Sequence, residues 1–427
     1  MKKILFNLLL ITPAVVSAGG FQLNLQGLKA AAMGGAFTGL SNDASAVFYN
    51  PGAMSSLTGH QFTFGANLVD PHVSVQTPQV ANTNQTSPRA TPIHFYYSAQ
   101  LNDKFNFGFL VNNQFGSSSS YEDDWQGRYI IQNISLRTFM FQPTVSYKLH
   151  DKLSIGASFV YATGSFSTEK AIPVSSSTSS EGKASLTGSG DGVGYNIGIF
   201  SNFLTLENGS KKTDFNLGLS YRSAMPIDLS NGEAEFTNIP VALQGQFPAT
   251  TGFTSKLTLP QVFTAGLSVQ HQYNENLLFT VIYDFNWTGW SSYDTLTFKF
   301  DNKETPESKS VKDWQDVVTH RFGLDITYKE KFSIRGGIYI DNSPIKDGFV
   351  SPELPDITQT AYTGGFGYKI NEKFSIDFSF IRQSAERRDL LLAANFDGNY
   401  RRKVNVYGLA LNIKLPGKSK SSTSTTE

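Results

Sequence analysis

The chain has 427 residues with 35 basic and 35 acidic side chains, so its formal net charge is zero. This balance gives no reason to expect nucleic acid or another polyanion as a partner. Cysteine is absent, which excludes disulfide bonds as a source of stability, while aromatic residues reach 13% and charged residues only 16%. The length allows several soluble domains or one large barrel, and the periodicity along the chain must decide between them.

The first 18 residues have the pattern of a secretory signal peptide. Lys2 and Lys3 precede an apolar run that ends in Ser17-Ala18, a small-residue cleavage site. The run is too short to span a bilayer as a helix, and no later stretch approaches the roughly 20 apolar residues that such a helix needs. We therefore predict that residues 1–18 are removed and that the mature chain begins at Gly19.

Residues 19–58 show no strand period. Their small residues, such as Ala30 to Ala32, favour a short helix or compact coil, and Asn50-Pro51 then interrupts the chain. A segment of this size cannot support its own core. It must therefore be buried against something larger.

From about His60 the sequence repeatedly alternates apolar and polar residues, which is the period of a strand with unlike faces. Phe374, Ile376, Phe378 and Phe380 alternate with Ser375, Asp377 and Ser379, so one face suits lipid and the other suits water. Aromatic residues gather at several strand ends, where rings can lie at the level of lipid headgroups. These are Trp287, Trp290 and Tyr293, and Tyr96 with Tyr97.

The connections between these strands alternate between short polar turns and long loops, as a membrane barrel requires. The six turns lie at 102–103, 150–151, 207–212, 274–276, 330 and 371–372, and the seven loops near 71–91, 115–136, 168–189, 224–257, 301–315, 342–358 and 386–401. This alternation predicts an all-β fold, an antiparallel transmembrane barrel of about fourteen strands over residues 59–415. Residues 19–58 would form a hatch in its lumen, and residues 416–427 a disordered polar tail. A large soluble β-sandwich is the alternative, but sandwiches rarely alternate turns and long loops so regularly.

Several motifs resemble the FadL/TodX family of outer-membrane transporters for long-chain fatty acids and aromatic hydrocarbons. In chain order these are 20–24 (GFQLN), 33–37 (MGGAF), 42–46 (NDASA), 48–51 (FYNP), 125–129 (WQGRY), 221–223 (YRS), 259–260 (LP), 287–291 (WTGWS), 341–344 (DNSP) and 352–356 (PELPD). The family's Asn-Pro-Ala element here reads Asn50-Pro51-Gly52. Single elements are weak signals, but their order and spacing cover essentially the whole mature chain.

The resemblance implies a hatch-plugged barrel of fourteen strands in the outer membrane of a Gram-negative bacterium, in contact with lipid bilayer and lipopolysaccharide. It implies passive uptake of a hydrophobic small molecule, most simply a long-chain fatty acid, by lateral diffusion through the barrel wall. By the same resemblance Gly19, Gly20 and Phe21 would lie near an inner pocket, and Asn50 and Pro51 would hold the hatch in place. The third strand, which contains Gly108, is the candidate for the lateral opening.

A fatty-acid carboxylate needs a cation or several donors, because burying that charge unpaired is costly. The candidates predicted to face the lumen are Arg222, Lys299 and Arg335. The alternative for each is a charge network inside the barrel, with acids such as Asp284, Asp325 and Asp377. The basic residues that the family places near the outer strand ends are not found around 161–164 and 296–297, which favours an uncharged aromatic hydrocarbon or alkane as the alternative substrate.

Other classes of function find little support in the sequence. The six histidines show no metal-ligand spacing, and the glycines around Asp191 lack the Lys and the strand–loop–helix context of a nucleotide site, so we expect no metal and no cofactor. No catalytic motif indicates an enzyme. A surface adhesin or structural barrel, or an aqueous porin, remains an alternative, although neither requires an internal plug that carries Phe21. The sequence leaves the oligomeric state open.

Overall fold

The structure, a computed structural model, describes residues 19–174 and 181–417. The predicted signal peptide and residues 418–427 of the predicted tail lie outside the described residues. In the described part of the chain, no helix is both long enough and apolar enough to cross a membrane.

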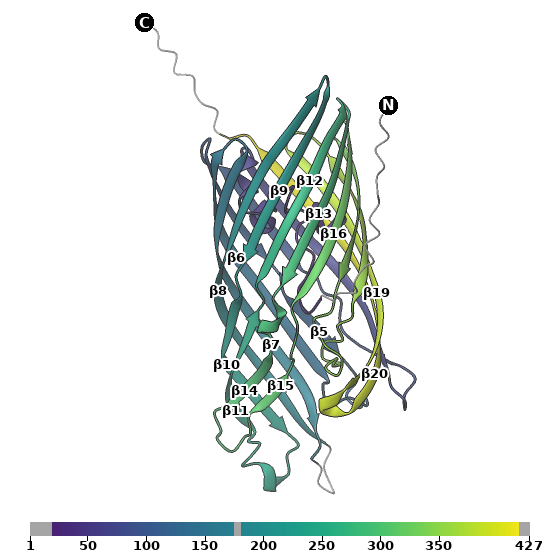
Figure 1. Cartoon of the computed structure of the whole chain (residues 1–427). Coiled ribbons are helices and arrows are strands. Elements are labelled where there is room, and N and C mark those ends of the chain that lie inside the picture. Colours follow the sequence, from purple (N-terminus) through teal and green to yellow (C-terminus); the bar gives the residue numbers. More distant parts are fainter. Residues whose placement is uncertain (1–18, 175–180, 418–427) are drawn as a thin grey trace.

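Fourteen strands close into an antiparallel barrel within the described residues, as the sequence predicted (Figure 1). Each pairs with the next, and the last pairs with the first through seventeen consecutive residue pairs. In order they are β1 (His60–Gln76), β3 (Ile93–Gln100), β4 (Phe105–Asn112), β6 (Asn133–His150), β7 (Leu153–Ile172), β8 (Gly182–Asn208), β9 (Lys211–Arg222), β12 (Val262–Asn274), β13 (Leu277–Thr288), β16 (Val317–Tyr328), β17 (Phe332–Asp341), β18 (Gln359–Lys369), β19 (Phe374–Leu391) and β20 (Phe396–Leu415).

Further strands extend the wall at the end that carries the long loops. They are β2 (Thr83–Asn84), β5 (Gly116–Ser120), β10 (Met225–Thr237), β11 (Thr250–Leu259), β14 (Thr295–Phe300) and β15 (Ser308–Val311). Short helices complete the described elements: α1 (Leu28–Ala32), α2 (Ala46–Tyr49), η1 (Ala53–Ser56), η2 (Val241–Leu243), η3 (Trp290–Ser292) and η4 (Leu392–Ala394). The end of β8 near the short turns pairs with β9, and its other end, near the long loops, pairs with β10. The wall therefore continues past the break between β9 and β10.

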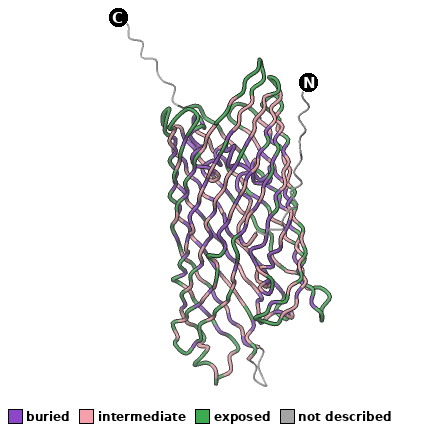
Figure 2. The backbone as a smooth tube through the Cα atoms, viewed as in Figure 1, coloured by how far each residue is buried: buried purple, intermediate pink, exposed green. Residues whose placement is uncertain are grey.

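The two faces of the wall differ as the alternating sequence predicts (Figure 2). On β6, Phe139 and Val145 are exposed on the outside, whereas Gln142 and Thr144 are buried inside the barrel. Large apolar side chains outside and hydrogen-bonded polar ones inside are the reverse of a soluble protein, because this outer face is solvated by lipid.

The prediction that the aromatic residues at the strand ends lie at the level of the lipid headgroups is partly wrong. Tyr96 and Trp290 are buried, with 0% and 1% of their surface exposed, so neither ring can reach the headgroups. Tyr96 donates a hydrogen bond to Gln26 Oε1, at 3.0 Å, inside the barrel. Adjacent aromatics on a strand point to opposite faces, so a pair such as Tyr96-Tyr97 supplies only one ring to the outside.

All six predicted short turns connect consecutive strands at one end of the barrel, but the predicted loops were too long. Regions 168–189, 224–257 and 386–401 are largely strand: β7 and β8 are joined only by residues 173–181, and β19 and β20 only around η4. Their Ser, Gly and charged residues were interpreted as loops. The period of two nevertheless continues in part of these extensions, because Ile227, Leu229 and Phe236 of β10 are buried and alternate with polar residues.

The N-terminal segment, residues 19–59, lies inside the barrel and is bonded to strands on several sides. Asp284 on β13 accepts hydrogen bonds from the N–H groups of Phe37 and Thr38, both at 2.9 Å. Gln142 on β6 donates to the carbonyl oxygen of Val47 at 2.7 Å, and Gly34 donates to Thr363 Oγ1 on β18 at 2.9 Å. These polar lumenal side chains therefore satisfy the irregular backbone that the segment brings into the barrel.

Candidate functional site

A cavity of about 680 Å³ lies inside the long-loop end of the barrel. Its volume is within the usual range for small-molecule pockets. Side chains from β6, β7, β8, β10, β11 and β14 and from the neighbouring loops line it, and most of them are aliphatic or aromatic. The apolar lining includes Leu136, Phe166, Leu186, Leu229, Phe236, Leu257, Leu296, Phe298, Tyr293 and Trp314.

Phe21 lines this cavity from the side of the N-terminal segment, and only 4% of its surface is exposed. Its ring centroid is 4.8 Å from that of Trp290, 5.4 Å from that of Tyr293 and 5.8 Å from that of Trp314, and the first two contacts are edge-to-face. Such aromatic contacts stabilise beyond simple burial of area. One residue of the N-terminal segment is thus built into the aromatic wall of the cavity.

Gly20 gives the chain the turn that brings Phe21 to this place. Its φ of +69° lies in the left-handed region, which glycine adopts without strain. A side-chain carbon there would also lie 2.6 Å from Trp290, closer than any van der Waals contact allows. Both the backbone angle and the indole therefore require glycine at this position.

The N-terminal segment also fills a break in the third strand of the barrel. Residues 113–115 separate β4 from β5, and there Leu23 N–H donates to Gln114 O at 2.8 Å and Gly116 N–H donates to Phe21 O at 2.9 Å. The Asn113 side chain bonds both neighbouring strands, since its Oδ1 accepts from Ile93 N–H at 3.0 Å and its Nδ2 donates to Thr138 O at 2.7 Å. At this break side chains and the N-terminal backbone supply the bonds that an unbroken strand would make.

Charged side chains also border the apolar cavity: Lys170, Lys309, Lys312, Glu307 and Glu353. Lys312 Nζ is 2.6 Å from Glu353 Oε2, and Lys309 Nζ is 3.0 Å from Glu307 Oε2. Burial disfavours the charge on Lys312, but the nearby Glu353 carboxylate outweighs it and holds the pKa of the ammonium above its ordinary value. Within the described residues Lys170 forms no ion pair, so this border has one positive charge in excess.

None of the three cations proposed from the sequence lines the apolar cavity. Lys299 does not face the lumen as expected, because it is exposed on β14 between the inward-facing Phe298 and the end of the strand. Arg335 belongs to the alternative charge network: its Nε is 2.8 Å from Asp325 Oδ2, and it also pairs with Asp377. This network borders a separate cavity of about 440 Å³ among the short turns.

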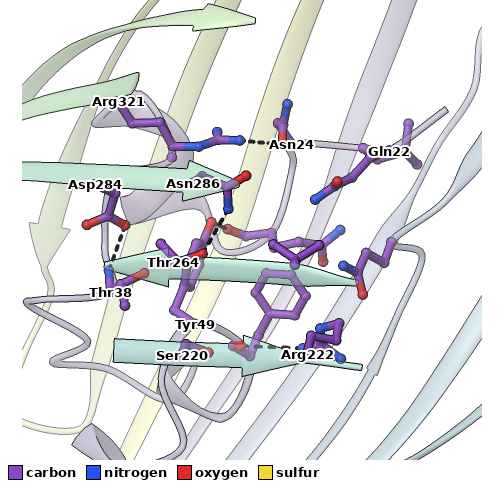
Figure 3. A pocket seen from close by; sticks show the side chains of 16 residues that line it. Gln22, Asn24, Thr38, Tyr49, Ser220, Arg222, Thr264, Asp284, Asn286 and Arg321 are labelled. Carbon is purple, nitrogen blue, oxygen red and sulfur yellow. Dashed lines mark hydrogen bonds between the residues drawn. The ribbon is translucent and has the colours of Figure 1, made fainter. Parts of the chain in front are cut away.

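Arg222 lies beside a smaller polar cavity of about 60 Å³ between the N-terminal segment and the wall (Figure 3). Its guanidinium donates to Gln142 Oε1 at 2.9 Å and stacks on Phe48, with 4.9 Å between its central carbon and the ring centroid. Arg321 Nη2 donates to Asn24 Oδ1 at 2.8 Å. Figure 3 shows these two side chains pointing toward each other. These arginines bind the N-terminal segment to the wall.

The sequence did not single out Lys170, Lys312 and Trp314, which border the cavity. All three fall in regions interpreted as loops, near 168–189 and 301–315, or at the edge of one. A tryptophan within an otherwise polar stretch was the available signal, because an indole in such a stretch is usually buried against something.

The sequence model of the family described as outer membrane protein transport protein (OMPP1/FadL/TodX) matches residues 9–415. The long-chain fatty acid transport protein of Escherichia coli O6:H1 is 25% identical over 400 residues, covering 84% of this chain and 85% of that protein. Outer membrane protein P1 of Haemophilus influenzae is 24% identical over 480 residues, covering 97% and 100%.

Two solved structures share the fold. A FadL homologue from Pseudomonas aeruginosa superposes with a TM-score of 0.76 at 18% identity, covering 93% of this chain and 100% of that one. The toluene transporter TodX of Pseudomonas putida gives 0.67 at 17% identity, covering 94% and 100%. The family consists of transport proteins rather than enzymes. The matched range includes the whole barrel, and the chain therefore belongs to the FadL/TodX family of transporters for hydrophobic compounds in the Gram-negative outer membrane.

Proposed function

We propose that this transporter takes up long-chain fatty acids passively, holds them in the 680 Å³ apolar cavity and releases them sideways into the bilayer. The single observation that carries the proposal is that the cavity is apolar and is closed on one side by Phe21, a residue of the N-terminal segment. An alkyl chain gains about 0.8 kcal/mol for each methylene removed from water, so such a cavity binds it without further specific contacts.

The charges at the border of the cavity favour an acid over a neutral hydrocarbon. A carboxylate that enters an apolar cavity needs a cationic partner. Lys170 lies at the border of the cavity, is exposed, and forms no ion pair within the described residues. Lys312, already paired with Glu353, can share its remaining donors. We therefore assign the headgroup to these two lysines, and Gly19, Gly20 and Phe21 to the inner end of the site.

A neutral aromatic hydrocarbon is the second candidate. The cavity presents many aromatic rings, among them Phe166, Phe236, Phe298 and Trp314, whose edges and faces suit another ring. Such a substrate makes no use of Lys170, which separates the two candidates experimentally.

The break at residues 113–115 supports a lateral exit. The N-terminal segment bonds there through Phe21 and Leu23, so movement of the hatch would uncover the break and the inner end of the cavity together. A chain leaving through the wall passes from apolar cavity to apolar lipid, without crossing water.

The test is uptake of labelled oleate into proteoliposomes. The intact protein is compared with a form lacking residues 19–21 and with Lys170→Met, and Lys148→Met near a short turn is the control. Saturable oleate uptake by the intact protein that falls in the truncated form and in Lys170→Met, but not in Lys148→Met, supports a fatty acid. Uptake of labelled toluene that is insensitive to Lys170→Met, without oleate uptake, supports the hydrocarbon, and uptake of neither contradicts both.

A further inference from the structure

A cluster of basic side chains lies on the outer face of the barrel wall, near the long loops. Exposed and buried residues alternate along β19 and β20, which run side by side (Figure 1). By this alternation Arg382 and Arg388 of β19 point away from the lumen, and so do Arg401 and Lys403 of β20. Arg89, from the connection between β2 and β3, lies against the outer face of β1. We call these five residues the basic patch.

The basic patch lies directly beyond the apolar band of the wall. On β20 the outward side chains of residues 407–415 are all aliphatic or aromatic, and this length matches the roughly 9–11 residues of a tilted transmembrane strand. Tyr407 pairs with Phe380 of β19 and with Leu68 of β1, so the band ends at the same level on all three strands. Long loops of outer-membrane barrels are extracellular. The basic patch is therefore at the level of the headgroups in the outer leaflet.

The basic patch carries an excess of positive charge. Three ion pairs neutralise three of its five cations: Arg89–Asp70 at 2.7 Å, Arg388–Asp397 at 2.6 Å and Arg401–Glu386 at 3.0 Å. Within residues 19–174 and 181–417, Arg382 and Lys403 form no ion pair, although Arg382 donates to Asn405 Oδ1 at 3.0 Å. Two exposed positive charges thus remain available to an anion from outside the chain.

The two available cations are close enough to bind one anion together. Lys403 pairs across the strands with Ser384, and Arg382 pairs with Asn405, so Arg382 and Lys403 are diagonal neighbours on one face. The α-carbons of such neighbours are about 7–8 Å apart, which is within the combined reach of these long side chains. A phosphate group accepts parallel hydrogen bonds from a guanidinium and a further bond from an ammonium.

We propose that the basic patch binds the phosphorylated lipid A headgroup of lipopolysaccharide, with Arg382 and Lys403 in contact with phosphate. The acyl chains of the same molecule then lie along the apolar band, against Tyr407, Leu409 and Leu68. Charge complementarity and position select this occupant, because it carries phosphate at the headgroup level of the outer leaflet and several acyl chains below it. Inorganic phosphate cannot use the apolar band. The proposal concerns the outside of the wall and does not depend on which molecule is transported.

The experiment measures the binding of diphosphorylated lipid A to the purified, folded protein in detergent by native mass spectrometry. A chelator is present, so that divalent cations do not bridge phosphate to the acids beside the patch. The intact protein is compared with the double variant Arg382→Gln/Lys403→Gln. The matched control, Lys104→Gln/Lys152→Gln, removes two exposed lysines beside the short turns at the opposite end. Loss of two cations that face anionic lipid should weaken binding about 30-fold, whereas the control should bind as the intact protein does.

Other ligands distinguish lipid A from other sources of phosphate. Lipid A from which both phosphates have been removed should bind the intact protein about as weakly as intact lipid A binds the double variant. Phosphatidylglycerol should bind more weakly than lipid A, and inorganic phosphate should not displace lipid A. Equal affinity of the intact protein and the double variant, equal binding of lipid A with and without phosphate, or equal binding of phosphatidylglycerol would overturn the proposal. Displacement by inorganic phosphate would do the same.

A second variant covers the case in which the double variant does not fold. Asp70→Asn leaves Arg89 without its ion pair and so adds one available cation to the basic patch. Lipid A should bind this variant about fivefold more tightly than the intact protein. An affinity that does not rise would overturn the proposal. Because no transport is measured, the result is independent of whether the fatty-acid proposal holds.

Discussion

Asn50 in the N-terminal segment donates a hydrogen bond to the carbonyl oxygen of Ile199 on β8, at 3.0 Å, and another to that of Thr38, at 3.1 Å. Its Oδ1 accepts from Gly52 N–H at 3.0 Å, and the residue is fully buried. One side chain thus joins two parts of the segment to the barrel wall.

Replacement of Asn50 by alanine should loosen the segment while the barrel remains closed. The variant leaves two buried carbonyl oxygens without these donors, which costs about 1–3 kcal/mol for each unsatisfied group. Hydrogen exchange of residues 28–57 should become faster, whereas exchange in β19 and β20 should not change. Asn82→Ala, which removes an exposed loop hydrogen bond, is the control. Unchanged exchange in residues 28–57 would contradict this role of Asn50.

Phe21→Ala should weaken substrate binding. The variant removes the ring that contacts Trp290, Tyr293 and Trp314 and opens the cavity on that side. We expect the affinity for a fluorescent fatty-acid analogue to fall about tenfold, or by 1.4 kcal/mol. Phe203→Ala removes a ring exposed on the outside of the barrel and should bind normally. Equal affinities of Phe21→Ala and Phe203→Ala for the analogue would show that Phe21 does not contribute to ligand binding.

Gly20→Ala should displace the N-terminal residues, and Gly209 provides a control that separates two causes. Both glycines have positive φ, +69° and +61°, so alanine at either costs about 1–2 kcal/mol in backbone energy. Only at Gly20 would the new methyl group overlap Trp290, because nothing lies within 4 Å of the corresponding position at Gly209. Trp290 fluorescence and ligand affinity should therefore change in Gly20→Ala alone, and a similar change in both variants would refute the steric argument.

The Arg128–Glu181 pair should hold its loop down to strongly acid pH. Both distances of this bidentate contact are short, 2.7 and 2.8 Å, and hydrogen bonds from Arg128 and then Tyr129 lower the Glu181 pKa to about 2 from an ordinary 4.5. Because the folded-state pKa is the lower one, the stabilisation is fully present above about pH 4.5 and is lost as the pH falls through 2.

Hydrogen exchange of residues 128–131 tests this dependence. The ratio of exchange rates between Glu181→Gln and the intact protein should be well above one at about pH 5 and close to one near pH 2. A ratio that does not change between these two pH values would show that the carboxylate does not hold the loop.

The sequence revealed the barrel because its two faces meet different solvents. Outward Phe378 and inward Asp377 alternate on β19, and the same contrast recurs along the chain, so strand number followed from the turns alone. At the long-loop end water lies on the outside and the cavity inside. Strand extensions there, such as residues 182–189 of β8, are rich in Ser and Gly and were interpreted as loops.

The cavity itself depends on side chains that are distant in sequence. Phe21, Phe166 and Trp314 meet only because the barrel closes and the N-terminal segment folds back into it. The sequence offered Arg335 two roles, a partner for a carboxylate or a member of a charge network with acids such as Asp325 and Asp377. Only closure of the barrel, which places both acids beside Arg335, decides for the network.

The break at residues 113–115 has a consequence for the timing of release. If release requires the N-terminal segment to withdraw, as proposed above, Gln114 O and Gly116 N–H would lose their partners, and a peptide group left bare towards lipid costs several kcal/mol. The open wall would then be a high-energy state, and return of the segment would restore both hydrogen bonds. The barrel would therefore stay closed between one passing molecule and the next.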